Sequence, residues 1–255
     1  MKNELFEYSF YAAGLVDIGR KRKSNQDEII LAPEIGFFGV SDGMGGLSNG
    51  AAASAYVKMS MPLLLENSVK NWSSQQLSSE EASDCLCKAV QACSNHLFTR
   101  ANTERFFSYG ATLAAVQLYT DCAIFVCLGD SRGYVLRKYR KLPEQITEDM
   151  NLAGELVRAG EITKEEALGL PESSRLTAFV GMSAPASPAV YVVKVKPGDR
   201  ILLCSDGLYS MVPERELASI MRSSRSPGRI CRRLIDRANE YGGRDNISAV
   251  YVRIK

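Results

Sequence analysis

The sequence lacks several features that would place it in a class at once. Its 255 residues contain no apolar run near the roughly 20 residues that a membrane-spanning helix needs, and no apolar leader follows Met1. It also has no phosphate-binding or dinucleotide-binding glycine motif. Neither a repeat of about 20 to 50 residues nor a linker divides the chain. We therefore expect one cytoplasmic domain over residues 1–255.

An excess of charge of one sign is missing too. The sequence has 31 Lys and Arg against 29 Asp and Glu, which gives a formal charge of +2. Such a balance supplies no strong field for nucleic acid or an anionic membrane, so we expect neither as a partner. Ligand recognition is left to local residues, and we expect a monomer.

Paired cysteines are also missing, although the chain has seven cysteines. None has Cys-x-x-Cys spacing, and an odd number in apolar surroundings is typical of free thiols in a reducing compartment. Cys85, Cys87, Cys93 and His96 lie close together in sequence. However, that segment has a helical pattern, and residues two apart point to different faces of a helix. This argues against a zinc site.

The chain does contain short β-type runs separated by helical segments. One helix is expected after the glycines near 45, with an end or kink at Pro62. After a loop at 71–79, a second helix is expected to run to about residue 105. Two more begin near Pro213 and Pro227. Tight turns between successive strands predict antiparallel pairing and an α+β fold. The predicted strands are 8–16, 28–32, 36–40, 108–119, 122–128, 133–139, 189–195, 200–204 and 247–254.

Residues 147–180 depart from this pattern. They are charged and break into short helical pieces, namely Leu152–Ala159, closed by Gly160, and a piece opened by the capping box Thr163–Glu166. The segment is too polar to form core. We expect it to be a small helical insert on the surface.

Acidic residues recur where apolar strands meet glycine or polar turns. One such acid on its own is most often part of a turn, as in Val40-Ser-Asp-Gly-Met-Gly-Gly46. Several gathered at one sheet edge would repel one another, and a cation between them resolves the repulsion. Oxygen ligands favour Mg²⁺ or Mn²⁺ over zinc or copper. The candidate ligands are Asp27, Asp42, Asp130, Asp206 and Asp245.

Phosphate ester hydrolysis is a reaction that suits such ions. Two ions about 4 Å apart lower the pKa of a shared water and direct it at phosphorus. Arg22, in the basic loop before Asp27, has the forked guanidinium that binds phosphate oxygens. The glycines at 43, 45 and 46 allow the backbone to approach the ions.

Six segments resemble, in order, the motif series of the metal-dependent type 2C protein phosphatases, bacterial branch. Together they span the chain from about residue 14 to its C-terminus, which makes the series far more specific than any one motif. The segments are Arg22-Lys-Ser-Asn-Gln-Asp27, Ser41-Asp-Gly-Met-Gly-Gly46, Tyr109-Gly-Ala-Thr-Leu113, Gly129-Asp-Ser-Arg132, Leu203-Cys-Ser-Asp-Gly-Leu208 and Gly243-Arg-Asp-Asn-Ile-Ser248.

The resemblance implies a fold and an activity. The fold is a two-sheet antiparallel β-sandwich with a helix pair on each outer face, in α/β/β/α layers, and the insert at 147–180 corresponds to the family's variable flap. The activity is hydrolysis of phosphoserine and phosphothreonine on proteins by a water bridging two Mn²⁺ or Mg²⁺ ions. Phosphorylated proteins are the implied partners, and a cognate Ser/Thr kinase is a candidate partner.

The resemblance also implies roles for individual residues. Asp42 bridges both ions, and Gly43 contributes its carbonyl. Asp206 and Asp245 hold one ion, and Asp27 acts on the other, directly or through a water. By the same correspondence, Asp130 serves a third, weaker ion and Arg22 binds the substrate phosphate.

The chain departs from the family pattern at several positions. Met150 follows Asp149 where members often have His, and Val180 stands where Arg often precedes the glycine. Ala111 replaces a usual Thr, and Met44 stands where animal members have His. No general acid is identified, since the only histidine, His96, flanks the apolar stripe of a helix. We hypothesise that a water on the metal supplies the proton.

Two other functions remain open from the sequence. One is a phosphatase of a small phosphorylated metabolite, because nothing in a metal site fixes what carries the phosphate. The other is a catalytically weak module that binds phosphoproteins, which the altered flap suggests. The intact acids argue against the module, because binding alone gives no reason to keep mutually repelling carboxylates.

Overall fold

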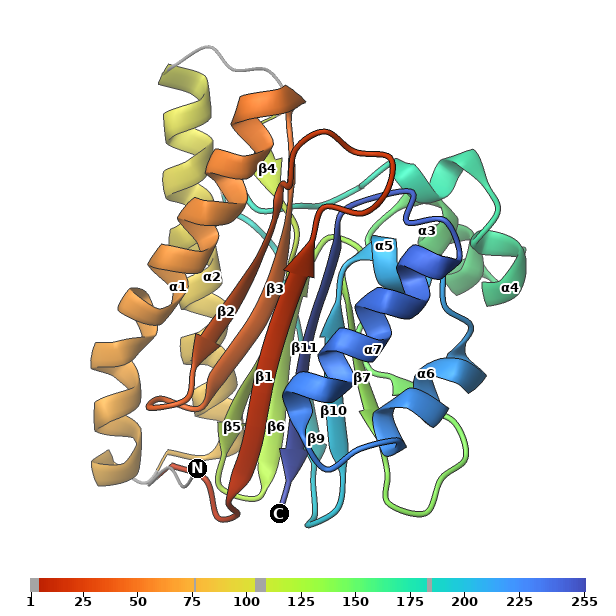
Figure 1. Ribbon diagram of the computed structural model, residues 1–255. Helices are drawn as coiled ribbons and strands as arrows, with labels where there is room; N and C mark the ends of the chain where they lie inside the picture. Colours follow the sequence, from red (N-terminus) through yellow and green to blue (C-terminus); the bar gives the residue numbers. More distant parts are fainter. Residues whose placement is uncertain (1–4, 76, 104–108, 183–184) are drawn as a thin grey trace.

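A computed structural model describes residues 5–75, 77–103, 109–182 and 185–255. Two β-sheets stack face to face, and helices cover the outer surface of each (Figure 1). Neighbouring strands within both sheets pair antiparallel. The predicted α+β sandwich in α/β/β/α layers is confirmed. None of the described helices is both long and apolar enough to cross a lipid bilayer.

The first sheet has five strands and contains the first and the last strand of the described chain. Its spatial order is β1-β11-β10-β7-β8. The strands are β1 (Phe10–Asp17), β11 (Ile247–Ile254), β10 (Arg200–Cys204), β7 (Arg132–Leu136) and β8 (Glu144–Gln145). Because β10 and β11 are neighbours and run in opposite directions, the end of β10 and the start of β11 lie at the same sheet edge.

The second sheet has the order β2-β3-β5-β6-β9, with the short β4 paired to β3. The predicted strand 108–119 begins outside the described residues and is divided at Thr112. The strands are β2 (Asp27–Ala32), β3 (Phe37–Met44), β4 (Gly110–Ala111), β5 (Leu113–Tyr119), β6 (Cys122–Leu128) and β9 (Ala189–Lys194).

The core between the sheets comes from alternating apolar residues on their inner faces. Phe10 of β1 meets Phe38 of β3 edge to face, with ring centroids 5.6 Å apart, and both side chains are fully buried. Phe125, Leu203 and Val250 belong to the same buried cluster. This packing fixes how the strand ends of one sheet face those of the other.

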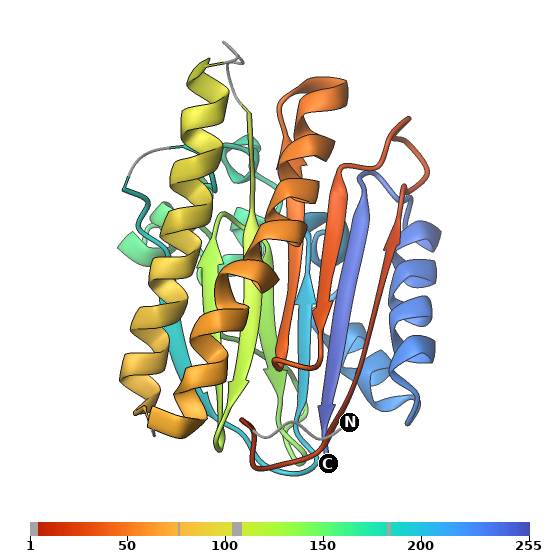
Figure 2. The ribbon, with the colours of Figure 1, turned by 90° about the vertical axis from the view of Figure 1, so that its left-hand side faces the viewer.

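Helices α1 (Gly46–Gln75) and α2 (Ser79–Thr103) cover the second sheet (Figure 2). Pro62 does not end the helix, because α1 runs through it to Gln75. The predicted loop at 71–79 is too long, since the connection between the helices lies between Gln75 and Ser79, where α2 begins. Its apolar stripe continues beyond the proline with Leu65, Val69 and Trp72, which are each at most 1% exposed. Burial of these side chains offsets the roughly 3 kcal/mol that an interior proline costs a helix. Residues 104–108, where α2 was expected to end, lie outside the described residues.

Helices α6 (Glu214–Arg222) and α7 (Pro227–Glu240) lie over the first sheet and, with the short α5 (Asp206–Tyr209), bury an apolar cluster against it. The short helical pieces predicted within residues 147–180 are confirmed as α3 (Leu152–Ala159) and α4 (Lys164–Ala167), and the 3₁₀ turn η1 (Pro171–Ser174) follows them. Gly160 closes α3 in the left-handed conformation, and Thr163 and Glu166 form the predicted capping box. Strand β7 ends at Leu136, short of the predicted residue 139.

Candidate metal centre and active site

The strand register brings two of the predicted acids face to face. Asp27 begins β2 and lies directly opposite Asp42 near the end of β3. Like charges in such a cross-strand pair destabilise a sheet. The side chain of Asp27 is buried, and its Oδ2 accepts a hydrogen bond of 2.7 Å from Ser205 Oγ, across the sandwich. The two sheets therefore meet at this pair of acids.

A cleft of about 810 Å³ opens beside this pair and is lined by residues from several segments of the chain. Six of the seven predicted site residues line it, and Asp27 lies buried outside the lining. Lys21 and Lys23 of the basic loop and Leu176 and Phe179 of the insert form part of its rim. The predicted residues in the lining are Arg22, Asp42, Gly43, Asp130, Asp206 and Asp245.

The charged forms of the carboxylates in this cluster are disfavoured by burial and by the neighbouring negative charges. Burial raises the pKa of Asp27 to about 7, with a further increase from Asp206. Burial followed by the charge of Asp206 raises the pKa of Asp130 to about 8. Burial and Asp245 raise the pKa of Asp206 to about 6. The pKa of Asp42 is raised well above its ordinary value by burial and then by Asp27. A cation among these groups would favour their charged forms.

The donor set fits a hard divalent cation. Among the described residues, the buried atoms Asp27 Oδ1 and Asp206 Oδ1 accept no hydrogen bond. The same part of the chain contains no group of three or more His, Cys, Asp or Glu side chains placed to hold a metal ion. Mg²⁺ does not need such a group, because it retains several waters and takes only one or two carboxylates from the protein. Carboxylates gathered along an open cleft suit an ion of that kind.

Arg22 contacts the cluster directly. Its Nη2 donates to Asp245 Oδ2 at 2.6 Å, and this bond is the main cause that raises the pKa of Arg22. The loop that carries Arg22 is held by Asn246, whose side-chain amide donates to the carbonyls of Ile18 and Ser24, each at 2.9 Å. The side chain of Arg22 is 55% exposed, which leaves it accessible to a phosphate.

Thr112 fixes Asp42 and the strand that follows it. Thr112 Oγ1 accepts from the Asp42 amide at 3.0 Å, and the Thr112 amide donates to the Asp42 carbonyl at 2.8 Å. The same hydroxyl lies 2.7 Å from Ser131 Oγ, next to Asp130. One buried threonine therefore links two of the acid-bearing segments.

Gly43 is required by the close approach of two backbones. A Cβ at residue 43 would lie 1.9 Å from the carbonyl oxygen of Gly50 in α1, which no side chain tolerates. The Gly43 amide donates to the Gln26 carbonyl at 3.0 Å. The glycine thus lets α1 begin against β3, beside Asp42.

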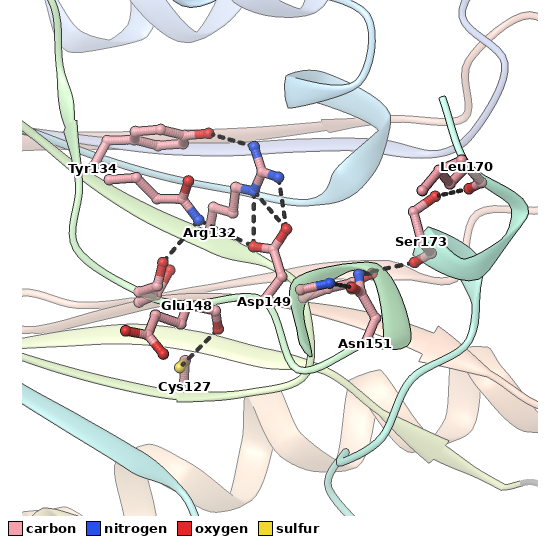
Figure 3. Close-up of polar contacts among 12 residues, drawn as sticks. Cys127, Arg132, Tyr134, Glu148, Asp149, Asn151, Leu170 and Ser173 are labelled. Carbon is pink, nitrogen blue, oxygen red and sulfur yellow. Dashed lines mark hydrogen bonds and ion pairs between the residues drawn. The ribbon is translucent and has the colours of Figure 1, made fainter. Parts of the chain in front are cut away.

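The insert is anchored by a buried ion pair. Arg132 Nη2 contacts Asp149 Oδ2 at 2.6 Å and its Nε contacts Asp149 Oδ1 at 2.9 Å, while Nη1 donates to Tyr134 (Figure 3). The guanidinium also lies 3.6 Å from the ring centre of Tyr209, just after Asp206. Asp149 therefore joins the insert to the sheet through Arg132.

Asn151 connects the insert to the acids. Its Oδ1 accepts from the Gly154 amide and caps α3, and its Nδ2 donates to Asp130 Oδ2 at 3.2 Å and to the Ser173 carbonyl at 2.9 Å. Figure 3 shows Asn151 between Asp149 and Ser173. A residue of the insert thus touches one of the candidate metal ligands.

Other candidate groups lie away from the cleft. The imidazole of His96 stacks on Tyr56, with ring centroids 5.1 Å apart, on the exposed side of the α1–α2 pair. Met44 lines the cleft and has no titratable group. All seven cysteines are free, and burial raises the pKa of Cys93 to about 12, which keeps it a thiol.

Four residues that support the site had no role assigned from the sequence. Thr112, Ser205 and Asn246 lie inside the motif segments quoted above, so the motifs were the available signal. Asn151 precedes a helical run, which is a signal for a cap and carries no information about Asp130. Their contacts are between residues 21 to 228 positions apart.

Comparison with known proteins decides the family. The sequence profile of the family described as Protein phosphatase 2C matches residues 20–245. The chain belongs to the protein phosphatase 2C family. It is 34% identical over 233 residues to the serine/threonine phosphatase stp of Listeria monocytogenes, and the match covers 91% of this chain and 86% of that protein.

Solved structures agree with this membership. The PPM Ser-Thr phosphatase MsPP of Mycobacterium smegmatis is 33% identical with a TM-score of 0.83, and the match covers 96% of this chain and 98% of that one. The catalytic domain of the phosphatase PstP, solved with two manganese ions, is 26% identical with a TM-score of 0.76 and covers 96% of this chain and 98% of its own. The resemblance read from the six motifs is confirmed.

Proposed function

We propose that this protein phosphatase 2C releases phosphate from phosphoserine and phosphothreonine on proteins in a reaction that depends on divalent metal. The observation that carries the proposal is the acid-lined cleft with Arg22 at its edge, in a chain that belongs to a family of protein phosphatases. When bound, a pair of divalent ions supplies Lewis acidity and lowers the pKa of the attacking water.

The proposed ligands of the metal ions are taken from the acids that the structure brings together and from the backbone beside them. Asp42 would be a ligand of both ions, and the Gly43 carbonyl would be a further ligand. Asp206 and Asp245 would hold one ion and Asp27 would act on the other. The opposed pair Asp27 and Asp42 and the orphaned oxygens of Asp27 and Asp206 support this assignment. The ions are Mn²⁺ or Mg²⁺, because every ligand is an oxygen.

Two further residues have separate roles in the proposal. Arg22 binds and orients the substrate phosphate, for which its exposed, charged fork is suited. Asp130 serves a third, weaker ion beside the insert. The proposal also includes a single catalytic domain over residues 1–255 with the flap at about 147–180, a monomeric state, a cytoplasmic location and a cognate Ser/Thr kinase that produces the substrates.

The test is phosphate release from phosphothreonine peptides with and without Mn²⁺. We expect release only with metal, and a loss of at least about 100-fold in kcat/KM in Asp206→Asn. Asp236→Asn is the matched control, because Asp236 is an exposed acid on α7 outside the cleft. Bound metal is measured separately by calorimetry.

The outcome also separates the other functions. Release from small phosphate esters but from no peptide would favour a phosphatase of metabolites. Bound metal without release from either substrate would favour a module that binds phosphoproteins. Full activity of Asp206→Asn would contradict the metal site.

A further inference from the structure

A second cleft lies at the opposite end of the sandwich from the acids. It has a volume of about 850 Å³ and forms where β7 ends and where β9 turns into β10. These segments lie at the bottom of Figure 1, away from the start of β11 at the top. Asp130 precedes β7 and lines the cleft with the acids, and Arg137 follows β7 and lines the second cleft. About 20 Å of extended chain therefore separates the two clefts.

This second cleft is lined mainly by cations, and we call it the basic cleft. The whole chain carries a formal charge of only +2, so the cleft is a local concentration of charge. Burial and the nearby Arg200 lower the pKa of Arg222, whose guanidinium donates to the backbone of this region. Five of the eight lining residues are basic, namely Arg137, Lys138, Arg140, Lys194 and Lys196.

Asp199, the one acid among the residues that line the cleft, links the two loops that form it. Asp199 is 4% exposed, and its carboxylate accepts from Arg137 Nη1 at 3.0 Å and from the amides of Lys138 and Lys196, each at 3.1 Å. These bonds join the loop after β7 to the β9–β10 turn. The Asp199 carboxylate is therefore satisfied by these bonds within the protein and does not neutralise the other cations that line the cleft.

Most of the remaining cations are left for a ligand. Lys194 pairs with Asp121 at 3.1 Å. Within the described residues, Lys138, Arg140 and Lys196 form no ion pair. The ring of Tyr139, which is 87% exposed, adds a flat apolar surface, and Lys138 Nζ lies 5.1 Å from its centre.

The backbone that carries these cations is held in place by contacts on two sides. Arg222 at the end of α6 donates to the carbonyls of Arg140 and Lys141 and holds the loop from outside. On the other side, Gly198 has a φ of +99°, and a Cβ there would lie 2.9 Å from Lys138 Cδ, so the lysine stem packs over the turn. A fixed backbone reduces the ordering entropy that a ligand must overcome.

We propose that the basic cleft docks an acidic segment of the phosphoprotein substrate, an inference that rests on the proposed function. The cleft is concave and carries an exposed aromatic ring, which suits an extended peptide better than a flat bilayer. A separation of about 20 Å corresponds to at least 6 extended residues. The acidic segment therefore lies about 6 to 12 residues from the phosphorylated residue.

Direct binding tests the proposal without catalysis. A fluorescent peptide of eight Asp and Glu residues, with no phosphate, is titrated with the enzyme and followed by anisotropy. We expect binding that weakens as salt rises, and about tenfold weaker binding to the triple variant Lys138→Gln, Arg140→Gln and Lys196→Gln. The matched control removes three exposed cations that do not line the cleft, in Lys88→Gln, Arg215→Gln and Arg232→Gln.

Kinetics then connect the cleft to turnover. Two phosphothreonine peptides are compared, one with four Glu residues about ten positions away and one with four Gln residues there. The acidic peptide should have about tenfold lower KM at equal kcat, because the cleft does not touch the reacting atoms. The triple variant of the cleft should remove this difference and leave hydrolysis of an aryl phosphate unchanged.

Several outcomes would overturn the proposal. They are equal affinity of the acidic peptide for the cleft variant and the control variant, equal KM for the two phosphopeptides in the wild-type enzyme, and binding of phosphatidylserine vesicles through the cleft without binding of the peptide. If the acidic peptide binds through the cleft but no phosphopeptide is hydrolysed, the docking site is supported and the proposed function fails.

Discussion

Asn151 Nδ2 donates to Asp130 Oδ2 at 3.2 Å, while Oδ1 of the same side chain caps α3. One side chain therefore fixes both the start of the insert and the orientation of a candidate metal ligand. Residues that orient ligands in this way tune the affinity of a metal site. The insert is thus part of the support of the acid cluster, in addition to forming a rim of the cleft.

Asn151→Ser separates these two roles. Serine retains a side-chain oxygen for the cap but is too short to reach Asp130. Because the bond to the Ser173 carbonyl is lost as well, we expect a moderate fall in unfolding temperature, together with about 10-fold to 100-fold weaker binding of the weakest Mn²⁺ ion in calorimetry. Thr163→Ala is the control, since it removes a cap from α4 without touching any of the candidate metal ligands. Unchanged binding of all ions in Asn151→Ser would show that the contact with Asp130 has no role in metal affinity.

Thr112→Val should destabilise the protein while preserving its shape. The buried Asp42 amide loses its acceptor, which costs about 1 to 3 kcal/mol of unfolding free energy. Urea denaturation of the metal-free protein measures the loss. Thr112→Ser keeps the hydroxyl and should lose much less, so equal losses in both variants would point to packing of the methyl group instead.

Gly43→Ala should be far more harmful than an ordinary glycine replacement. The new Cβ overlaps the Gly50 carbonyl, so β3 and α1 must separate at a cost of about 3 kcal/mol or more. Gly228→Ala is the control, because a Cβ there meets nothing within 4 Å at the start of α7 and should be neutral or stabilising. Thermal unfolding compares the two, and equal stability would contradict the close approach.

The metal-free protein should lose stability as pH rises from about 4 to 8. The folded pKa values of Asp27, Asp130 and Asp206, about 7, 8 and 6, exceed the usual value of 3.8, so the folded state holds extra protons in this range. Stability that these groups contribute at low pH is lost as pH rises through each folded pKa. Unfolding temperatures in EDTA at pH 5.5, 7 and 8.5 measure the trend.

Added Mn²⁺ should reverse this dependence, because metal competes with protons for the same oxygens. The increase in unfolding temperature caused by Mn²⁺ should therefore grow with pH. Asp130→Asn should flatten the decline seen in EDTA. A steady rise of stability with pH in EDTA would contradict the electrostatic account of the cluster.

His96→Gln should leave catalysis unchanged. The imidazole stacks on Tyr56 on the exposed side of the α1–α2 pair, outside the acid-lined cleft. Aryl phosphates, whose leaving group needs little protonation, should be cleaved well relative to phosphothreonine peptides. Steady-state rates on both substrates are compared. A large loss with the peptide alone would identify His96 as a proton donor.

The sequence by itself determined the class of fold and the kind of site. Alternating apolar runs joined by tight turns specify antiparallel strands through local geometry, and acids at strand ends specify a hard-cation site through their charge. The sequence misplaced the end of α1, because the apolar stripe beyond Pro62 is interrupted by polar residues. The helix extends to Gln75 only because Val69 and Trp72 are buried against the sheet.

Tertiary structure decided how the acids are held and what surrounds them. The opposition of Asp27 and Asp42 is a matter of strand register, and the bond from Ser205 to Asp27 depends on how the two sheets stack. The link from Asn151 to Asp130 joins two elements with no periodic relation in sequence. The basic cleft likewise forms only when separate turns meet. Such contacts depend on packing of the whole sandwich, and local residue patterns carry no record of it.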